Sequence, residues 1–319
     1  MKFLVTGGAG FIGSHSIELL LEQGHDISVL DNLATGRLEN LSAVERWIHI
    51  VEGDIRNRGL LMSVMQGECY DGVLHLAAVA SVPDSVRLPL KSHDVNLTGA
   101  LNVLEAARQT GIGRVVVASS AAVYGPAPEV PTSETMLTRV ASPYAAQKLA
   151  VEAYAQTYND LYQLETVALR YFNVYGPRQD PTSPYSGVIS VFLECFERGS
   201  QPVIFGDGRQ TRDFVYVRDV AQVNLLALTT KEAGGQCINV GTGVETSILQ
   251  VTETLSDITG SSFGCSFGKR RPGDPYRSCA DIEKLQALLG FQPRYSLIDG
   301  LQKLRDYDES RTPSVGLRR

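Results

Sequence analysis

The chain has 319 residues, 43% of them hydrophobic, and 35 acidic against 29 basic side chains. A chain of this length buries a sizeable core without disulfides or metal ions, and we expect two unequal lobes. The mildly acidic balance argues against a general nucleic-acid or membrane surface. Five cysteines without C-x-x-C spacing disfavour a zinc site and a disulfide framework, and the apolar run after Lys2 is too short for a signal or membrane segment. We therefore expect a cytoplasmic protein.

Short β-branched runs alternate with longer amphipathic stretches through the first half of the chain. The runs predicted as strands are residues 2–6, 27–31, 48–53, 72–77, 114–120 and 166–172. This alternation predicts an α/β fold, a doubly wound parallel sheet of the Rossmann type over residues 1–172. From residue 173 to 319, loops rich in Pro, Gly and Arg predict a smaller mixed α/β lobe that binds substrate. Residues 214–258 look like the first lobe again, and we expect them to pack back onto it.

A glycine turn follows the first strand and opens the first helix. The stretch VTGGAGFIGSH places Gly8, Gly10 and Gly13 in G-x-G-x-x-G spacing, and Gly7, Gly10 and Gly13 in G-x-x-G-x-x-G spacing. Such glycines allow a tight turn and let the backbone approach a pyrophosphate at the helix N-terminus. Alone the pattern is weak, but its place between a strand and a helix favours a dinucleotide site.

Asp31 closes the second predicted strand, at about the spacing expected of the carboxylate that binds an adenosine ribose. A carboxylate there repels a 2′-phosphate. The sequence therefore favours NAD over NADP as the cofactor.

The stretch SPYAAQK, residues 142–148, predicts a proton-transfer device at the start of a helix. Ser142 suits the N-cap and Pro143 the first helical position, so Tyr144 and Lys148 lie one turn apart on the same face. A free tyrosine has a pKa near 10, but a nearby ammonium and the helix N-terminus favour the tyrosinate. Many chains contain Y-x-x-x-K by chance, so the pair indicates this function only in the context of other motifs.

That context is ASSAAVYG, residues 118–125, at the end of the fifth strand, where an open α/β sheet places its ligand crevice. Ser119 or Ser120 could hydrogen-bond the substrate hydroxyl that Tyr144 deprotonates. The residues alone leave the choice between the two serines open.

Together with YFNVYGPR and RRPGD, these motifs make the chain resemble, nearly end to end, an extended short-chain dehydrogenase/reductase of the nucleotide-sugar epimerase group. The resemblance implies that Ser120 assists catalysis, that Tyr144 is the base, and that Lys148 holds the nicotinamide ribose and lowers the tyrosine pKa. The motif does not exclude the neighbouring Ser119 as the catalytic serine. No metal site is implied.

The resemblance also implies a set of cofactor contacts beyond the catalytic residues. They are Gly7, Gly10, Phe11, Ile12, Gly13, Asp31, Asn32, Asp54, Ile55, Leu76, Ala77, Ala78, Asn96, Ser119 and Tyr171. On the substrate side, it implies that arginines grip the diphosphate and that a carboxylate binds the uridine ribose. The implied substrate contacts are Ser81, Ser120, Tyr144, Asn173, Val188, Arg212, Arg271, Asp274 and Ser278.

The implied reaction is NAD-dependent inversion at C4 of a UDP-sugar through a 4-keto intermediate. A 4,6-dehydratase needs an Asp-Glu pair where this chain has Ala121 and Ala122, which disfavours elimination. A nucleotide-sugar decarboxylase stays open, and a non-enzymatic dinucleotide sensor is disfavoured because Tyr144 and Lys148 are both present. Family members commonly dimerise through two helices per subunit, here residues 96–109 and 143–161, as a four-helix bundle.

Ser278 bears on the size of the sugar. In relatives restricted to glucose and galactose this position is a tyrosine, whereas relatives that accept N-acetylated sugars have a small residue. The resemblance therefore favours UDP-N-acetylglucosamine and UDP-N-acetylgalactosamine, with the plain hexoses as further substrates.

Overall fold

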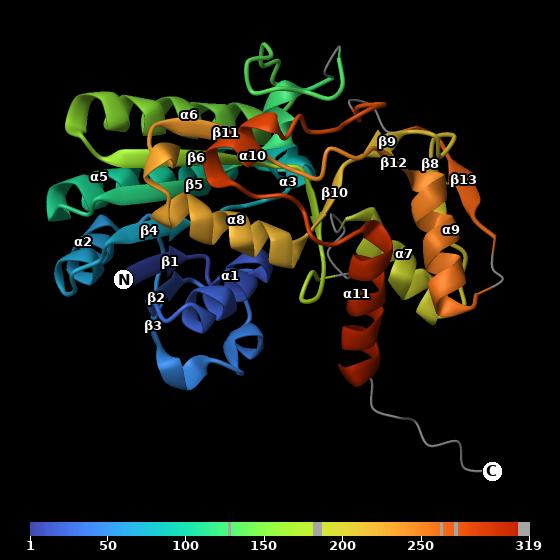
Figure 1. The fold of residues 1–319 in the computed structure, drawn as a ribbon, viewed down its shortest axis with the longest axis horizontal. Helices are drawn as coiled ribbons and strands as arrows, with labels where there is room; N and C mark the ends of the chain where they lie inside the picture. The colour runs from blue at the N-terminus through green and yellow to red at the C-terminus, as the bar shows by residue number, and fades with distance from the viewer. Residues whose placement is uncertain (127–128, 181–186, 262–263, 271–273, 312–319) are drawn as a thin grey trace.

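The computed structural model describes residues 1–126, 129–180, 187–261, 264–270 and 274–311 (Figure 1). Their centre is a seven-stranded sheet in the order β11-β6-β5-β4-β1-β2-β3, with every neighbouring pair parallel. Its strands are β1 (Lys2–Thr6), β2 (Asp26–Asp31), β3 (Ile48–Glu52), β4 (Gly72–His75), β5 (Arg114–Ser120), β6 (Glu165–Tyr171) and β11 (Gln236–Val240). The order reverses between β1 and β4, and a ligand crevice opens at the carboxyl ends there. The predicted Rossmann-type sheet is confirmed.

Helices cover both faces of the sheet because its strands are apolar on both sides. Phe3 and Val5 of β1 belong to one core cluster, with α1 (Phe11–Glu22) and α8 (Val217–Thr229). Leu4, between them, belongs to a second cluster. That cluster includes residues of α2 (Arg58–Gln66), α5 (Ala100–Thr110) and α6 (Pro143–Tyr162). Successive side chains of a strand point to opposite faces, so one buried strand supplies both cores.

Short helical segments connect the strands of this lobe. They are η1 (Leu38–Leu41), η2 (Glu45–Trp47), α3 (Val82–Arg87), α4 (Pro89–His93), the π-helical η3 (Asp94–Gly99), η4 (Ala121–Tyr124) and η5 (Lys231–Ala233). The π-helical segment runs directly into α5, and π-helical turns occur often at functional sites.

A smaller lobe, on the right of Figure 1, packs α7 (Val188–Glu197), α9 (Ile248–Thr259) and α11 (Leu297–Arg311) around its own core. Three two-stranded pairings accompany these helices. They are β7 (Asn173–Tyr175) with β10 (Phe214–Tyr216), β8 (Val203–Phe205) with β13 (Ser266–Gly268), and β9 (Thr211–Arg212) with β12 (Thr246–Ser247). The first two pairs are parallel and the third is antiparallel.

The structure differs from the prediction at one point in the return of the chain to the first lobe. Within residues 214–258, α8 and β11 join the sheet core, but Ile248, Val251 and Leu255 of α9 are buried in the core of the smaller lobe. Their spacing forms one apolar stripe, and that stripe contacts α7 and α11. A later helix, α10 (Glu283–Leu289), packs on the first lobe instead.

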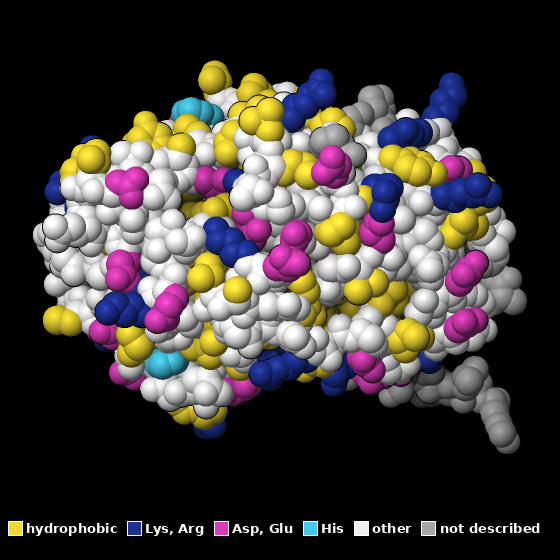
Figure 2. All heavy atoms as spheres, turned by 45° about the horizontal axis from the view of Figure 1, so that its top comes forward, with side chains coloured by type: hydrophobic (Ala, Val, Ile, Leu, Met, Phe, Trp, Pro, Cys, Tyr) yellow, Lys and Arg dark blue, Asp and Glu magenta, His cyan; other side chains and the backbone are white. Residues whose placement is uncertain are grey.

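Charges of both signs are interspersed on the face shown in Figure 2, without a continuous field of either sign. None of the helices in the described ranges combines the length and the apolar composition needed to cross a membrane.

Candidate active site

The turn between β1 and α1 brings the backbone very close to the end of β4. Gly7 has a φ of +73°, and a Cβ there would lie 2.6 Å from the backbone nitrogen of Ala77. A Cβ on Gly13 would lie 2.4 Å from the Gly7 carbonyl oxygen, so the start of the helix packs directly on the turn. The first N–H groups of α1 have no intrahelical partners, as in any helix. Gly10, at the N-cap, supplies no side-chain cap for them. These features fit the diphosphate of a dinucleotide.

Asp31, the last residue of β2, lies beside this turn. Its Oδ2 accepts the backbone N–H of Ala9 at 2.9 Å, and its Oδ1 accepts that of Leu33 at 2.8 Å. Burial raises the pKa of the Asp31 carboxyl, and the two backbone hydrogen bonds lower it. Each oxygen keeps a lone pair, so the carboxylate fits the predicted role of accepting ribose hydroxyls.

The segment predicted along the adenine lies after β3. Asn32 donates a hydrogen bond to Asp54 at 2.8 Å, and the Arg56 guanidinium holds the pKa of the Asp54 carboxyl far below its usual range. Ile55 is buried against α5 and the end of η3, where a Cβ on Gly99 would lie 2.5 Å from its side chain. These contacts fix the loop, and its contact with a cofactor stays a prediction.

Asn96 is 2% exposed, and its amide is used within the protein. The amide oxygen accepts the Val79 N–H at 2.7 Å, while the amide nitrogen donates to the Val79 carbonyl at 3.1 Å and to Gln147 at 2.9 Å. Asn96 therefore ties the loop after Leu76–Ala78 to α6. It shapes the predicted cofactor path rather than presenting a free amide to it.

Tyr171 is likewise engaged in the interior. Its hydroxyl donates to Asn224 of α8 at 2.6 Å, and Asn224 donates to Ser16 of α1 at 3.0 Å. Burial raises the pKa of this phenol. A cofactor contact of Tyr171, which stays a prediction, would use its ring or backbone.

Tyr144 lies in the first turn of α6, as the sequence predicts. The Ser142 hydroxyl caps the helix by accepting the Ala145 N–H at 3.2 Å, with Pro143 at the first position. The Tyr144 N–H donates to the hydroxyl of Ser85 in α3 at 3.0 Å. The helix start, and with it the tyrosine, is therefore fixed from two sides.

The two candidate serines have different partners. The Ser119 hydroxyl donates to the buried carboxylate of Glu152. Ser120 instead has its side chain beside Tyr144: burial raises the pKa of the phenol, and the Ser120 side chain lowers it. The Ser120 oxygen also accepts the Ala122 N–H at 3.2 Å, which leaves its proton for another acceptor. The geometry therefore favours Ser120 as the serine beside the tyrosine.

Lys148 is buried one turn behind Tyr144. Its Nζ donates to the Ala118 carbonyl at 2.7 Å and lies 5.8 Å from the centre of the Tyr144 ring. Burial lowers the pKa of this lysine to about 8, and the charge of Glu152 opposes that effect. Burial also lowers the pKa of nearby His75 to about 3, so the imidazole is neutral at pH 7. Lys148 is thus a cation close to the phenol.

In the smaller lobe, two residues with separate predicted roles lie in contact. Arg212 donates from Nη2 to the Asp274 carboxylate at 2.5 Å and from Nη1 to the Thr211 carbonyl at 2.6 Å. Arg271, the second predicted diphosphate arginine, lies outside the described residues. The two residues predicted to bind a diphosphate and a ribose thus form one ion pair in the structure.

The remaining predicted substrate residues come from four separate segments of the chain. Asn173 is exposed at the start of β7, and Val188 is the first residue of α7. Ser81 caps α3 by accepting the Asp84 N–H at 3.0 Å, and Ser278 is half-buried in the segment after Asp274.

Sequence reasoning missed the groups that support the catalytic residues. Ser85, which holds the start of α6, carries no local motif. Glu152 lies four residues after Lys148, and this helical spacing was a usable signal. Its partner Arg170 comes from β6 and could not be paired with it from the sequence alone.

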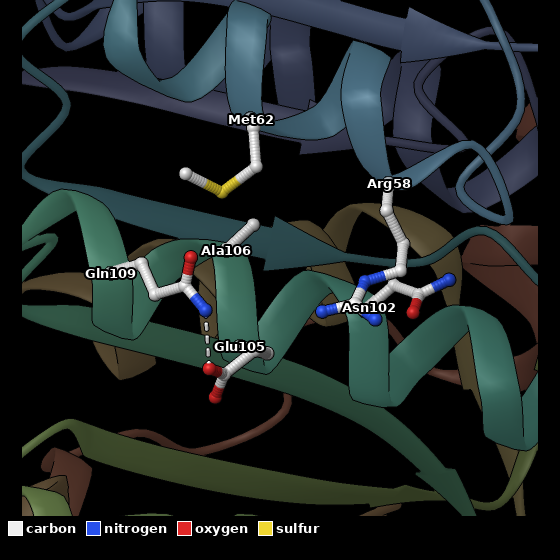
Figure 3. A pocket seen from close by; sticks show the side chains of 6 residues that line it. All are labelled: Arg58, Met62, Asn102, Glu105, Ala106 and Gln109. Atoms are coloured by element: carbon white, nitrogen blue, oxygen red, sulfur yellow. Dashed lines mark hydrogen bonds between the residues drawn. The ribbon is translucent and has the colours of Figure 1, made fainter.

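A hollow between α2 and α5 lies apart from these residues (Figure 3). It is lined by Arg58, Met62, Asn102, Glu105, Ala106 and Gln109. The predicted site residues do not line it, so it is not the candidate active site.

A parallel sheet with a glycine turn, and a Ser-Tyr-Lys group at its strand ends in which Tyr144 and Lys148 are buried, define a short-chain dehydrogenase/reductase of the extended type. Residues 3–241 match the model of the NAD dependent epimerase/dehydratase family. The chain belongs to this family, and NAD is its cofactor.

Similar proteins cover the chain almost completely. A UDP-glucose 4-epimerase of Mycolicibacterium smegmatis is 41% identical over 312 residues, which are 96% of this chain and 98% of that protein. The structure of a Thermotoga maritima UDP-glucose 4-epimerase with UDP-glucose has a TM-score of 0.93 and 38% identity, covering 97% of this chain and 99% of that one. A Methanobrevibacter ruminantium UDP-N-acetylglucosamine 4-epimerase, in complex with UDP-N-acetylmuramic acid, also has a TM-score of 0.93, with 37% identity and coverage of 98% and 99%.

Proposed function

We propose that this protein is a UDP-sugar 4-epimerase that interconverts UDP-N-acetylglucosamine and UDP-N-acetylgalactosamine, with UDP-glucose and UDP-galactose as further substrates. The observation that carries the proposal is the placement of Lys148 Nζ 5.8 Å from the centre of the buried Tyr144 ring, with the Ser120 side chain beside the phenol. The three side chains lie at the carboxyl ends of the strands, beside the glycine turn. Epimerase relatives that align with nearly the whole chain support the same assignment.

In this reaction Tyr144 takes the proton of the sugar 4-hydroxyl and later returns it. When bound at the glycine turn, NAD would supply the hydride chemistry at C4, and its oxidised form would add positive charge near the tyrosine. In the protein alone, burial keeps the phenol protonated at neutral pH. The positive charge of the oxidised nicotinamide and that of Lys148 together favour the tyrosinate. Ser120 hydrogen-bonds the same sugar oxygen. The 4-keto sugar turns over while its diphosphate is held, so the stereocentre inverts without net oxidation.

The residues after Ser120 favour epimerisation over elimination. Ala121 and Ala122 form the start of η4 and carry only methyl groups. A 4,6-dehydratase must also remove a C5 proton and protonate the C6 hydroxyl, which these methyl groups cannot do. A nucleotide-sugar decarboxylase is the remaining alternative. No residue of this site favours it.

The preference for N-acetylated sugars rests on Ser278. A serine leaves room for a 2-acetamido group during the rotation of the ring, where a tyrosine would fill the space. A relative that acts on UDP-N-acetylglucosamine and one solved with UDP-glucose are about equally similar to this chain. Both pairs of sugars therefore belong in the test.

The test is a conversion assay with purified protein and no added NAD. UDP-N-acetylglucosamine should yield UDP-N-acetylgalactosamine, measured by ion-exchange chromatography, because NAD copurifies with the protein and is regenerated in each cycle. UDP-glucose, assayed in parallel, should yield UDP-galactose. Accumulation of a 4-keto-6-deoxy sugar, or no conversion of either sugar, would contradict the proposal.

The protein should act as a homodimer that joins α5 and α6 of each subunit in a four-helix bundle. Three large apolar side chains of α6, Tyr154, Leu161 and Tyr162, are 41%, 69% and 47% exposed in the single chain. A partner subunit would cover them. Sedimentation equilibrium measures the assembly, and a monomer at assay concentration would contradict this arrangement.

A further inference from the structure

A buried ion pair lies behind the catalytic lysine, and the reaction scheme above does not use it. Glu152 of α6 and Arg170 of β6 are 9% and 6% exposed. The guanidinium donates from Nε to Glu152 Oε1 at 2.9 Å and from Nη2 to Oε2 at 2.7 Å. This two-point geometry fixes the carboxylate strongly.

The pair connects every element that carries a catalytic side chain. Glu152 also accepts the hydroxyl of Ser119, the residue before Ser120 at the end of β5. Arg170 donates from Nη1 to the Tyr124 hydroxyl at 2.8 Å, and Tyr124 donates to Asn239 of β11 at 2.6 Å. The strand end, the following turn and α6 are thus held against one another by side chains.

The charges in this network are unequal in number. Glu152 lies one helical turn after Lys148, so a single carboxylate faces two buried cations, Lys148 and Arg170. The charge of Glu152 acts on Lys148 and opposes the effect of burial on its pKa. Other titratable groups around the network are His75 of β4 with a pKa lowered to about 3, Tyr124 and Cys237 with pKa values raised to about 12, and Glu134, which accepts the Asn239 N–H.

We propose that Glu152, locked by Arg170, is a positioning residue that holds the Ser119–Ser120 strand end against α6 and keeps Lys148 in its charged form. The inference rests on the proposed function. Glu152 itself does not touch substrate or cofactor in this scheme, so it acts through Lys148 and Ser120.

The consequence is a defined shift in pH dependence. A step that needs the Lys148 ammonium is active below the pKa of the lysine and fails as the pH rises through it. Glu152→Gln keeps the size of the side chain and an acceptor for Ser119 but removes the charge, so burial lowers the lysine pKa unopposed. The alkaline fall in kcat should then move to lower pH by about one unit, and kcat on that limb should drop about tenfold.

Glu165→Gln is the matched control. Glu165 of β6 pairs with Arg114 of β5 at the end of these strands opposite Ser119 and Arg170, and Arg114 Nε donates to it at 3.0 Å. This variant removes an Arg–Glu ion pair that is more exposed and far from Lys148, and it should leave the alkaline limb unchanged. If Glu152→Gln and Glu165→Gln have pH profiles that both superimpose on that of the unmodified protein, the inference is wrong.

The double variant Glu152→Gln/Arg170→Gln separates charge from folding. It removes both members of the ion pair, so no unpaired Arg170 charge stays buried, and thermal stability should recover relative to Glu152→Gln. The alkaline limb should remain shifted, because Lys148 still lacks its carboxylate. Recovery of the pH profile together with stability would mean that the role is only structural and would overturn the inference.

The double variant also carries the test if Glu152→Gln does not fold. The two proposals fail in different ways. Lack of epimerisation by the unmodified protein counts against the proposed function, whereas normal turnover with an unshifted Glu152→Gln profile counts against the positioning role alone.

Discussion

The two halves of the candidate site are built differently. In the first lobe, the catalytic groups have fixed partners before any ligand binds: the Tyr144 backbone is held by Ser85, and Lys148 by the Ala118 carbonyl. In the smaller lobe, Arg212 and Asp274 are paired with each other, and Asn173 is exposed. The predicted proton-transfer half is preorganised, whereas in the predicted substrate half the two charged side chains contact each other.

This difference follows from the chemistry of each half. Proton transfer depends on sub-ångström placement and on charges set in a buried environment, which rigid strand ends and helix starts supply. A 4-keto sugar must rotate between its two hydride transfers, so the groups that contact the sugar cannot grip it as tightly. The anchor has to be the diphosphate, and Arg212 of β9 is a predicted contact for it.

The largest expected effect comes from breaking the preorganised half. Tyr144→Phe removes the proton acceptor but keeps the ring, so kcat should fall about 10²- to 10⁴-fold. Folding and bound NAD should be unchanged, because the Ser85 contact uses the backbone of residue 144. Thermal unfolding and the absorbance of extracted NAD check these two points, and the conversion assay measures kcat.

Tyr154→Phe is the matched control, since Tyr154 lies on the same helix and is 41% exposed. It should turn over like the unmodified protein. Near-normal kcat for Tyr144→Phe would remove the tyrosine from the mechanism and would leave the two halves of the site without the proposed division of roles.

A smaller effect is expected from the substrate half. Arg212→Lys keeps the positive charge but loses the planar fork that contacts Asp274 and, in the proposal, the diphosphate. KM for the UDP-sugar should rise about tenfold, equivalent to the loss of about 1.4 kcal/mol, with kcat nearly constant. Initial-rate kinetics separate the two constants.

Arg198→Lys serves as the control for this substitution, because Arg198 forms an ion pair with Glu194 on the surface of α7. Its KM should not change. A loss of kcat at constant KM in Arg212→Lys would assign this arginine to the chemical step and would contradict the distinction between the halves.

The regular half of the molecule could be predicted from the sequence because its signals are local. Buried parallel strands give continuous apolar runs. The helix cap at Ser142 and the turn at Gly7 are determined by residues adjacent in the sequence. The fold and the helical juxtaposition of Tyr144 and Lys148 followed from these signals. The proposed boundary at residue 172 stays a prediction.

The contacts that the sequence left open are between residues far apart in the chain. The choice of Ser120 over Ser119 depends on Glu152, and the pairing of Arg212 with Asp274 joins β9 to a residue 62 positions further along the chain. The path of α9 was mispredicted for a similar reason, since an apolar stripe does not say which of two cores it faces. Such partners follow from tertiary packing and have no local pattern.

The most selective effect should come from Ser278→Tyr. Ser278 is half-buried, and a tyrosine there would occupy space that the 2-acetamido group needs while the 4-keto sugar rotates. We expect kcat/KM to fall at least about tenfold for UDP-N-acetylglucosamine and much less for UDP-galactose, since even one methylene that does not fit a pocket costs about 1–3 kcal/mol. Ser278→Ala keeps the space and should retain both activities, which controls for loss of the hydroxyl. Equal losses on both substrates in Ser278→Tyr would mean that the residue supports the loop rather than the sugar, and the proposed preference for N-acetylated substrates would then lose its basis.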